Sequence, residues 1–263
     1  MPDTREIYKG KALISKDMQF NFRIPKTNQL YLRKKVKIPN KPSKELARVF
    51  GDLLGDGHLQ VGHGLVSFYS KNLNEIWIEQ ERFSKLFGIR GKIYKKKNKK
   101  SDYRLFFCSK TLAQFFHHIK MPNGNKTDQE FLIPYWIMNG SGKIKGNFLS
   151  GFYDAEGCIY PSREKGKTRW RICINQHKRE MLRKSGLKLM NQLVLLHNNL
   201  NITTGPVRVQ KARKRKDGTK IVKLFFEIKK ESIREFGKSI NFENPLKKQK
   251  LLKAINNNNY RKG

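Results

Sequence analysis

Two segments of the sequence each place an acidic residue at the expected end of a helix. The first ends in Asp56 and Gly57, and the second ends in Glu156 and Gly157. A carboxylate in this position faces the negative end of the helix dipole, which typically costs about 0.3–1 kcal/mol. A divalent cation would offset that repulsion, because hard carboxylate oxygens suit Mg²⁺ that also binds a phosphate. Asp56 and Glu156 are therefore predicted to hold Mg²⁺, or Mn²⁺, beside a phosphate.

Small residues recur four positions apart on both of these helices. The first helix has Gly51 and Gly55, and the second has Gly151 and Ala155. Residues at this spacing share one helical face, and small side chains let two helix backbones approach closely. The two helices are predicted to pack against each other and to bring both acids to one centre. The glycine after each acid is predicted to end its helix through a positive φ.

The elements around these helices occur twice along the chain. Residues 43–57 and 145–157 have apolar residues at helical spacing, and each segment is followed by patterns for two strands, a helix, two strands and a short helix. Arg104–Phe107 and Lys223–Phe226 occupy the same place in the two orders. The sequence thus predicts an α+β fold of two pseudo-symmetric α-β-β-α-β-β-α repeats, each with one antiparallel β-sheet.

A basic stretch precedes the first repeat and is punctuated at its end by Pro39 and Pro42. We expect it to be an extension that adds phosphate contacts, with a short strand near residues 30–38. The predicted divisions are the basic N-terminal extension 1–43, the first repeat 44–130, a linker 131–143, the second repeat 144–255 and a polar C-terminal tail 256–263.

The charge of the chain predicts a polyanionic partner. It has 57 Lys and Arg residues against 21 Asp and Glu residues, a formal net charge of +36. A hydrophobic content of 37% argues against a disordered basic tail, although a ribosomal or chromatin-type protein stays open. The sequence contains neither a signal peptide nor an apolar run of about 18 residues. With three widely spaced cysteines, an intracellular protein without a membrane partner is expected.

Two basic turns occupy equivalent places in the repeats. Residues 90–104 and residues 208–223 each hold eight Lys or Arg and one acid. A two-stranded ribbon fits the major groove of B-form DNA, so the two turns are predicted to be paired arms along a duplex. The residues predicted to contact DNA are Lys92, Lys95, Lys96, Lys97, Arg104, Arg169, Arg171, Arg208, Gln210, Arg213 and Arg215.

The two acid-ended segments resemble the motifs of the LAGLIDADG homing endonucleases. Leu149–Gly157 is similar throughout, and Val49–Gly57 is a looser match in which Leu54 stands where the family name has its first Asp. The resemblance covers about residues 44–250. Two such motifs, about one hundred residues apart and in register with a repeat, are far more specific than one.

This resemblance implies a monomer whose two sheets form a saddle over a long, asymmetric double-stranded DNA site, with helices on the outer face. It implies that Asp56 and Glu156 bind the metal and cut both strands across the minor groove, leaving short 3′ overhangs. The family often adds a Gln or Lys near the end of a following strand, and Lys71 and Gln176 are assigned to that catalytic role. Ser70 departs from the usual polar amide in the first half.

Three functions remain compatible with the sequence. The first is a site-specific, intron-encoded double-strand DNA endonuclease. The second is a maturase that binds its own intron RNA without cleavage, and the third is a DNA-binding regulator on the same scaffold. Two mutually repelling acids favour the enzyme, because a pure binder does not need them. A chain that starts at Met1 and ends at Gly263 is expected to be intron-encoded rather than an intein.

Overall fold

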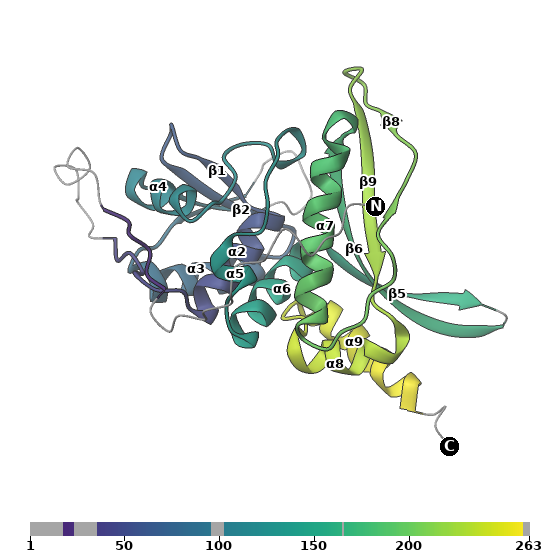
Figure 1. Cartoon of the computed structure of the whole chain (residues 1–263). Coiled ribbons are helices and arrows are strands. Elements are labelled where there is room, and N and C mark those ends of the chain that lie inside the picture. The colour runs from purple at the N-terminus through teal and green to yellow at the C-terminus, as the bar shows by residue number, and fades with distance from the viewer. Residues whose placement is uncertain (1–17, 24–35, 96–102, 165, 260–263) are drawn as a thin grey trace.

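The computed structural model describes residues 18–23, 36–95, 103–164 and 166–259. Two antiparallel sheets lie on either side of a central pair of helices, and further helices pack against the sheets (Figure 1). The predicted α+β fold of two similar halves is confirmed. None of the helices in the described ranges is both long and apolar enough to cross a bilayer.

The first half begins with a helix whose start is set by a serine. The Ser43 hydroxyl accepts a hydrogen bond from the Leu46 N–H at 3.1 Å, and Leu46, Phe50 and Leu53 bury the apolar stripe. Its sheet has the order β1-β2-β4-β3. The elements are α2 (Lys44–Gly55), β1 (His58–Gln60), β2 (Leu65–Ser70), α3 (Leu73–Phe87), β3 (Lys92–Lys95), β4 (Tyr103–Cys108) and α4 (Lys110–His118).

A connection with two short helical segments, η2 (Lys126–Asp128) and α5 (Tyr135–Met138), leads to the second half. Its sheet has the order β5-β6-β9-β7, and β8 also pairs with β9. The β5–β6 hairpin projects from the body (Figure 1). The elements are α6 (Gly142–Glu156), β5 (Gly157–Glu164), β6 (Lys167–Arg179), η3 (Glu180–Leu182), α7 (Arg183–Asn198), β7 (Arg208–Val209), β8 (Arg213–Lys214), β9 (Lys220–Glu227), η4 (Lys230–Ser232), α8 (Ile233–Ser239) and α9 (Pro245–Asn259).

The strand registers of the two sheets correspond. Leu105 on β4 pairs with Phe68, and its counterpart Leu224 on β9 pairs with Gln176. Side chains alternate between faces along a strand, and Leu105 and Leu224 are fully buried. Each sheet therefore has one face covered by helices and one open face, and Phe68 and Gln176 both lie on the covered face.

Strands β5 and β6 are longer than the sequence indicated. The patterns predicted strands over Cys158–Tyr160 and Arg169–Asn175, whereas pairing continues out to Glu164 with Lys167. The added residues 161–163 of β5 are not buried, so backbone pairing holds that part of the hairpin. Strand β6 also continues past Asn175 to Arg179, where Gln176 and Lys178 are buried. Helix α6 also starts before the predicted Lys145, since Ser141 accepts a hydrogen bond from the Ile144 N–H at 3.4 Å.

The glycines after the two acids do not act through a positive φ, so that prediction is wrong. Gly157 has a φ of −81°, and Gly57 is absent from the glycines with positive φ. Space is the reason for glycine instead. A Cβ at Gly57 would clash with Leu53 one turn earlier, and a Cβ at Gly157 would clash with Tyr153.

The described part of the N-terminal extension packs on the first half. The ring of Phe20 meets Phe115 and Trp136 edge-on, with centroids 6.0 and 5.5 Å apart. The Lys37 N–H donates to the Phe87 carbonyl at 2.9 Å. Most of the predicted strand at residues 30–38 lies outside the described residues, and residues 36–38 form no strand.

Candidate active site and nucleic-acid interface

The ends of α2 and α6 lie together because the two helices meet through glycine. A Cβ at Gly51 would clash with the backbone of Phe148, and a Cβ at Gly151 would clash with the backbone of Arg48. The backbones can approach this closely only where side chains are absent, as the four-residue spacing predicted. The contact brings the C-terminal ends of both helices, and with them the two acids, to one centre.

The two acids interact electrostatically. The pKa of Glu156 is raised to about 7, first because the surrounding protein removes water from its carboxylate and second because Asp56 repels it. The pKa of Asp56 is also raised, chiefly by loss of hydration, although Lys126 and Lys247 lower it. Both side chains still reach solvent. A cation that binds both carboxylates would relieve this repulsion.

Two lysines that the sequence did not identify bind the backbone carbonyls at the ends of these two helices. The Lys126 ammonium donates to the carbonyls of Leu53 at 3.1 Å and Leu54 at 2.7 Å, and also to that of Gly55. It therefore uses all three of its N–H groups on the last turn of α2. No pattern in the sequence distinguishes Lys126 among 57 lysine and arginine residues.

Lys247 does the same for the other helix. Its ammonium donates to the carbonyls of Tyr153 at 3.1 Å, Asp154 at 2.6 Å and Gly157 at 2.8 Å. A cation at a helix C-terminus offsets the negative end of the dipole and pairs carbonyls that otherwise lack donors. The unfavourable placement of the acids is thus already partly compensated by the protein itself.

Gln176 lies beside Glu156. It is 7% exposed on the covered face of β6, and its hydrogen bond lowers the pKa of Glu156. The structure therefore brings this predicted residue into the site. Lys71 lies just beyond β2 and is exposed. His58 pairs with Ser67 and Cys158 pairs with Cys173, so the register after the two motifs matches Gln176 with Ser70 rather than with Lys71. The catalytic role of Lys71 stays a prediction.

A cavity of about 310 Å³ connects Glu156 to both sheets. His58 pairs with Ser67 on the open face of the first sheet, and His177 lies on the open face of the second. Both histidines line the cavity together with Glu156, Lys126 and Gln176. The acid centre therefore opens onto the open faces of both sheets instead of being enclosed by the core.

Asp56 lines a second cavity, of about 70 Å³, with Ser70 and Glu75. Ser70 donates a hydrogen bond to Glu75 there. The two acids thus face different surroundings, since Glu156 has an amide neighbour and Asp56 has a hydroxyl and a further carboxylate within its cavity.

The donor set suits a hard divalent cation that is shared with a substrate. The two carboxylates are hard oxygen ligands whose pKa values are raised chiefly by loss of water, and Asp56 raises that of Glu156 further. Among the described residues, no group of three or more His, Cys, Asp or Glu could hold a metal alone. Asp56 and Glu156 would therefore hold Mg²⁺ or Mn²⁺, and substrate and water oxygens would complete the coordination.

A buried arginine ties the two helices together behind the acids. Arg48 is 4% exposed, and its guanidinium donates to Asp52 at 2.9 Å on its own helix. It also donates to Ser150 and to Asp154 on α6, each at 2.5 Å. Removing one partner from such a buried pair is strongly destabilising, so this network fixes the helix pair that carries the acids.

The open face of the first sheet carries part of the predicted DNA interface. Arg104 lies there, donates to Ser67 at 3.0 Å and packs over the Tyr69 ring. Lys92 pairs with Phe106 on the same face, whereas Lys95 pairs with Tyr103 and shares the other face with Ile93. Lys96 and Lys97 lie outside the described residues.

The open face of the second sheet carries more of the predicted contacts. Arg208 pairs with Phe225, and Arg213 pairs with Ile221, all on the side away from the helices. Gln210 donates its backbone N–H to the Lys223 carbonyl at 2.9 Å, which continues the line of β7. The remaining predicted contact in the turn is Arg215, whose backbone N–H donates to the Thr219 carbonyl at 2.8 Å.

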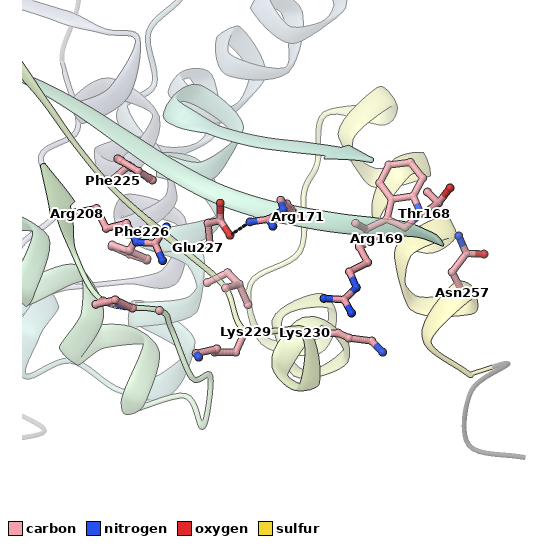
Figure 2. A pocket seen from close by; sticks show the side chains of 14 residues that line it. Thr168, Arg169, Arg171, Arg208, Phe225, Phe226, Glu227, Lys229, Lys230 and Asn257 are labelled. Carbon is pink, nitrogen blue, oxygen red and sulfur yellow. Dashed lines mark hydrogen bonds and ion pairs between the residues drawn. The ribbon is translucent and has the colours of Figure 1, made fainter. Parts of the chain in front are cut away.

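A cationic pocket of about 220 Å³ opens where β9 leaves β6 (Figure 2). Arg171 donates to Glu227 at 2.5 Å, and the buried indole N–H of Trp170 has no acceptor among the described residues. The net charge of the lining is strongly positive. Its cationic residues are Arg169, Arg171, Arg208, Lys229 and Lys230.

Known proteins resemble this chain in sequence and in fold. A family model described as LAGLIDADG-like domain matches residues 143–241. The solved structure of the LAGLIDADG meganuclease I-AabMI bound to uncleaved DNA has a TM-score of 0.50 and 12% identity, covering 82% of this chain and 90% of that chain. The second repeat thus matches a LAGLIDADG-like domain, and the chain has a fold similar to that of a LAGLIDADG meganuclease, in agreement with the resemblance of its two motifs.

Two relatives carry enzyme names of other kinds. The tRNA-splicing ligase RtcB of Pyrococcus furiosus is 32% identical over 224 residues, 80% of this chain and 22% of that protein. The glutamine–fructose-6-phosphate aminotransferase of Methanocaldococcus jannaschii is 27% identical over 132 residues, 50% of this chain and 12% of that protein. The chain therefore spans only a small part of these relatives' length.

Proposed function

We propose that the protein is a site-specific, double-strand DNA endonuclease of the homing type. The observation that carries this proposal is the cavity that joins Glu156, beside Asp56, to the open faces of both sheets. A DNA backbone lying across those faces would reach the acids without displacing the core. The +36 charge of the chain supports a nucleic-acid partner.

The proposed reaction is hydrolysis of one phosphodiester in each strand, with short 3′ overhangs. A divalent cation, when bound, polarises the scissile phosphate, lowers the pKa of an attacking water and stabilises the leaving oxygen. Asp56 and Glu156 would hold that cation. Gln176 would orient Glu156, and Lys126 and Lys247 would keep positive charge beside the phosphates while fixing the helix ends.

The basic residues of the two sheets would position the duplex. Lys92 and Arg104 serve the first half, and Arg208 and Arg213 serve the second, from the open faces that border the cavity. The cationic pocket at β6 would take a backbone phosphate, with the free Trp170 N–H as one donor. Two motifs in one chain need no second copy, so we propose a monomer.

The names of the relatives do not change this proposal. The matching segment is a minor part of a ligase and a smaller part of an aminotransferase. A segment shared by proteins with such different names does not define either reaction, but it fits an element that can be carried into unrelated genes. We propose the intron-encoded setting, and placement within a longer protein would leave the reaction unchanged.

The test removes the acids one at a time. A DNA site recovered from a randomised plasmid library is cut with Mg²⁺, and Asp56→Asn and Glu156→Gln are compared with Glu81→Gln, an exposed acid paired with Arg90. Both site variants should lose double-strand cleavage by several orders of magnitude and keep DNA binding, while Glu81→Gln stays active. Linearised plasmid from either site variant would refute the mechanism. Binding of intron RNA without any DNA cleavage by the wild type would support a maturase instead.

A further inference from the structure

A lysine on β6 is buried completely without a carboxylate partner. Lys178 is 0% exposed, and its ammonium lies 3.8 Å from the centroid of the Phe131 ring. Lysines are almost never fully buried unless they are paired. Loss of water lowers the pKa of Lys178 to about 8. Burial of this ammonium is therefore unfavourable by itself, and other contacts must stabilise it.

Its hydrogen bonds identify what it holds. The Lys178 ammonium donates to the backbone carbonyl of Lys126 at 2.6 Å and to that of Gln129 at 2.7 Å. The neighbouring Arg179 donates to Asp128 at 2.6 Å. Side chains of strand β6, in the second half, thus bind both ends of the η2 segment, which belongs to the connection after the first half.

The η2 segment is also held from the first half, where the Lys126 ammonium binds the end of α2 and the Gly124 N–H, just before the turn, donates to the Leu59 carbonyl at 2.8 Å. Residues 126–128 form a single short turn with no buried residue. Asn125 accepts a hydrogen bond from the Thr127 N–H at 3.1 Å, which shapes the turn but does not attach it to the sheets. The polar contacts from β6 tie the backbone of the turn to the second half, which carries Glu156.

The first residue of that turn is Lys126, whose ammonium reaches the end of α2 beside Glu156. A shift of the backbone carbonyl that Lys178 holds would move this ammonium as well. The other helix end does not depend on Lys178. Lys247 comes from the start of α9, and the Glu243 and Asn244 N–H groups just before that helix donate to Asp154.

We infer that Lys178 is a positioning residue that holds Lys126 at the Glu156 centre, so that the two strand cuts have separate structural supports. This inference rests on the proposed function. Lys178 touches neither acid, and it acts through the main chain of the η2 segment. It also couples docking of the two halves to completion of one cleavage centre.

The first measurement needs no cleavage. Lysine amines of the full chain are modified with a limiting amount of acetic anhydride and located by mass spectrometry. Lys178→Met should raise the reactivity of Lys126 several-fold while leaving that of Lys247 unchanged, and Lys178→Arg should restore part of the protection. Unchanged reactivity of Lys126 in folded Lys178→Met, or an equal rise at Lys247, would overturn the inference whether or not the protein is a nuclease.

The second measurement follows both strands of the cleavage site in single turnovers. Lys178→Met should slow the same strand that Lys126→Met slows, by on the order of 10- to 100-fold, the usual cost of displacing an active-site group by about 1 Å. The other strand and the DNA affinity should change little, so nicked DNA accumulates. Equal slowing of both strands would indicate a merely structural role and overturn the inference.

A second variant covers the case in which Lys178→Met does not fold. Asp128→Asn weakens the ion pair with Arg179 at a partly exposed position and leaves the core intact. It should shift Lys126 reactivity and the strand ratio in the same direction by a smaller factor. A folded Asp128→Asn protein with wild-type values in both measurements would count against the grip of β6 on the turn.

Discussion

The two halves bring an equivalent lysine to an equivalent helix end by opposite chemistry. In the first half, the backbone carbonyl of Lys126 is held by the ammonium of Lys178 at 2.6 Å. In the second half, Asp154 accepts from the N–H groups of Glu243 at 2.9 Å and Asn244 at 3.2 Å, just before the helix that carries Lys247. In the first half a cationic side chain binds a backbone carbonyl, and in the second half an anionic side chain binds backbone N–H groups.

This difference explains the looser first motif. Asp154 stands at the motif position that Leu54 occupies in the first half. Leu54 is 2% exposed, and its apolar side chain cannot accept hydrogen bonds from backbone N–H groups as Asp154 does. On its side, Lys178 of β6 binds the backbone of the η2 turn instead. The two acid-ended helices can therefore share a layout without sharing the residues that maintain it.

The largest expected effect comes from the lysines themselves. Lys126→Met and Lys247→Met each remove three hydrogen bonds to helix-end carbonyls and one positive charge beside an acid. Each should lower the single-turnover cleavage rate by about 10²- to 10³-fold, the range for losing one preorganised donor. The two variants should slow opposite strands. A shared effect on the same strand would show that the centres are not separate.

The helix contact should respond equally from either side. Gly51→Ala and Gly151→Ala each force a Cβ into the backbone of the other helix, which cannot move aside. Each should lower the free energy of unfolding by about 3 kcal/mol or more, at or above the upper part of the range for overpacking. Gly62→Ala is the matched control, since a Cβ there meets nothing within 4 Å. Denaturant unfolding measures all three, and a strong asymmetry between Gly51 and Gly151 would contradict a symmetric contact.

The loss of folding stability at acidic pH should arise mainly from a histidine of the second half. His197 is buried between Tyr153, whose hydroxyl lies 2.9 Å from Nε2, and the Leu193 carbonyl, 2.7 Å from Nδ1. Burial lowers its pKa from 6.5 to about 4. Above pH 6.5 neither the folded nor the unfolded chain protonates this ring, so its contribution to stability is complete. As the pH falls from 6.5 to 4, only the unfolded chain gains the proton, and stability decreases by about 3 kcal/mol.

The check is the stability of His197→Gln across that pH range. The variant should lose this part of the pH dependence, whatever its stability at pH 7. The described histidines of the first half, such as His58 and His117, are not buried and should contribute far less when replaced. A wild-type slope retained in His197→Gln would show that other groups cause it.

The smallest effects should come from single phosphate contacts. Lys92→Gln on the first sheet and Arg213→Gln on the second should each reduce the slope of log affinity against log salt by about one. Footprinting should show losses at opposite ends of the site. An equal loss along the whole footprint would contradict the assignment of one sheet to each half-site.

The sequence by itself determined the repeats, the helix pair and the two acids. Helical spacing of Gly51, Gly55 and Gly151 specifies a close contact wherever the helices meet, and alternation on strands such as Lys220–Glu227 specifies one buried face. These signals are local, so they survive without knowledge of the partner segments. The outer part of the β5–β6 hairpin lacked such a signal and was underestimated.

Only the tertiary structure decided which cations serve the site. Lys126, Lys247 and Lys178 bind backbone carbonyls that lie 49 to 94 residues away, and a carbonyl is present at every position of any sequence. The spacing of residues in the sequence therefore cannot show which three lysines bind these carbonyls. The strand register likewise decided that Lys71 is not the counterpart of Gln176. Ser70 and Gln176 each lie three residues beyond the strand partner of the residue that follows the motif glycine, and Lys71 points to the other face.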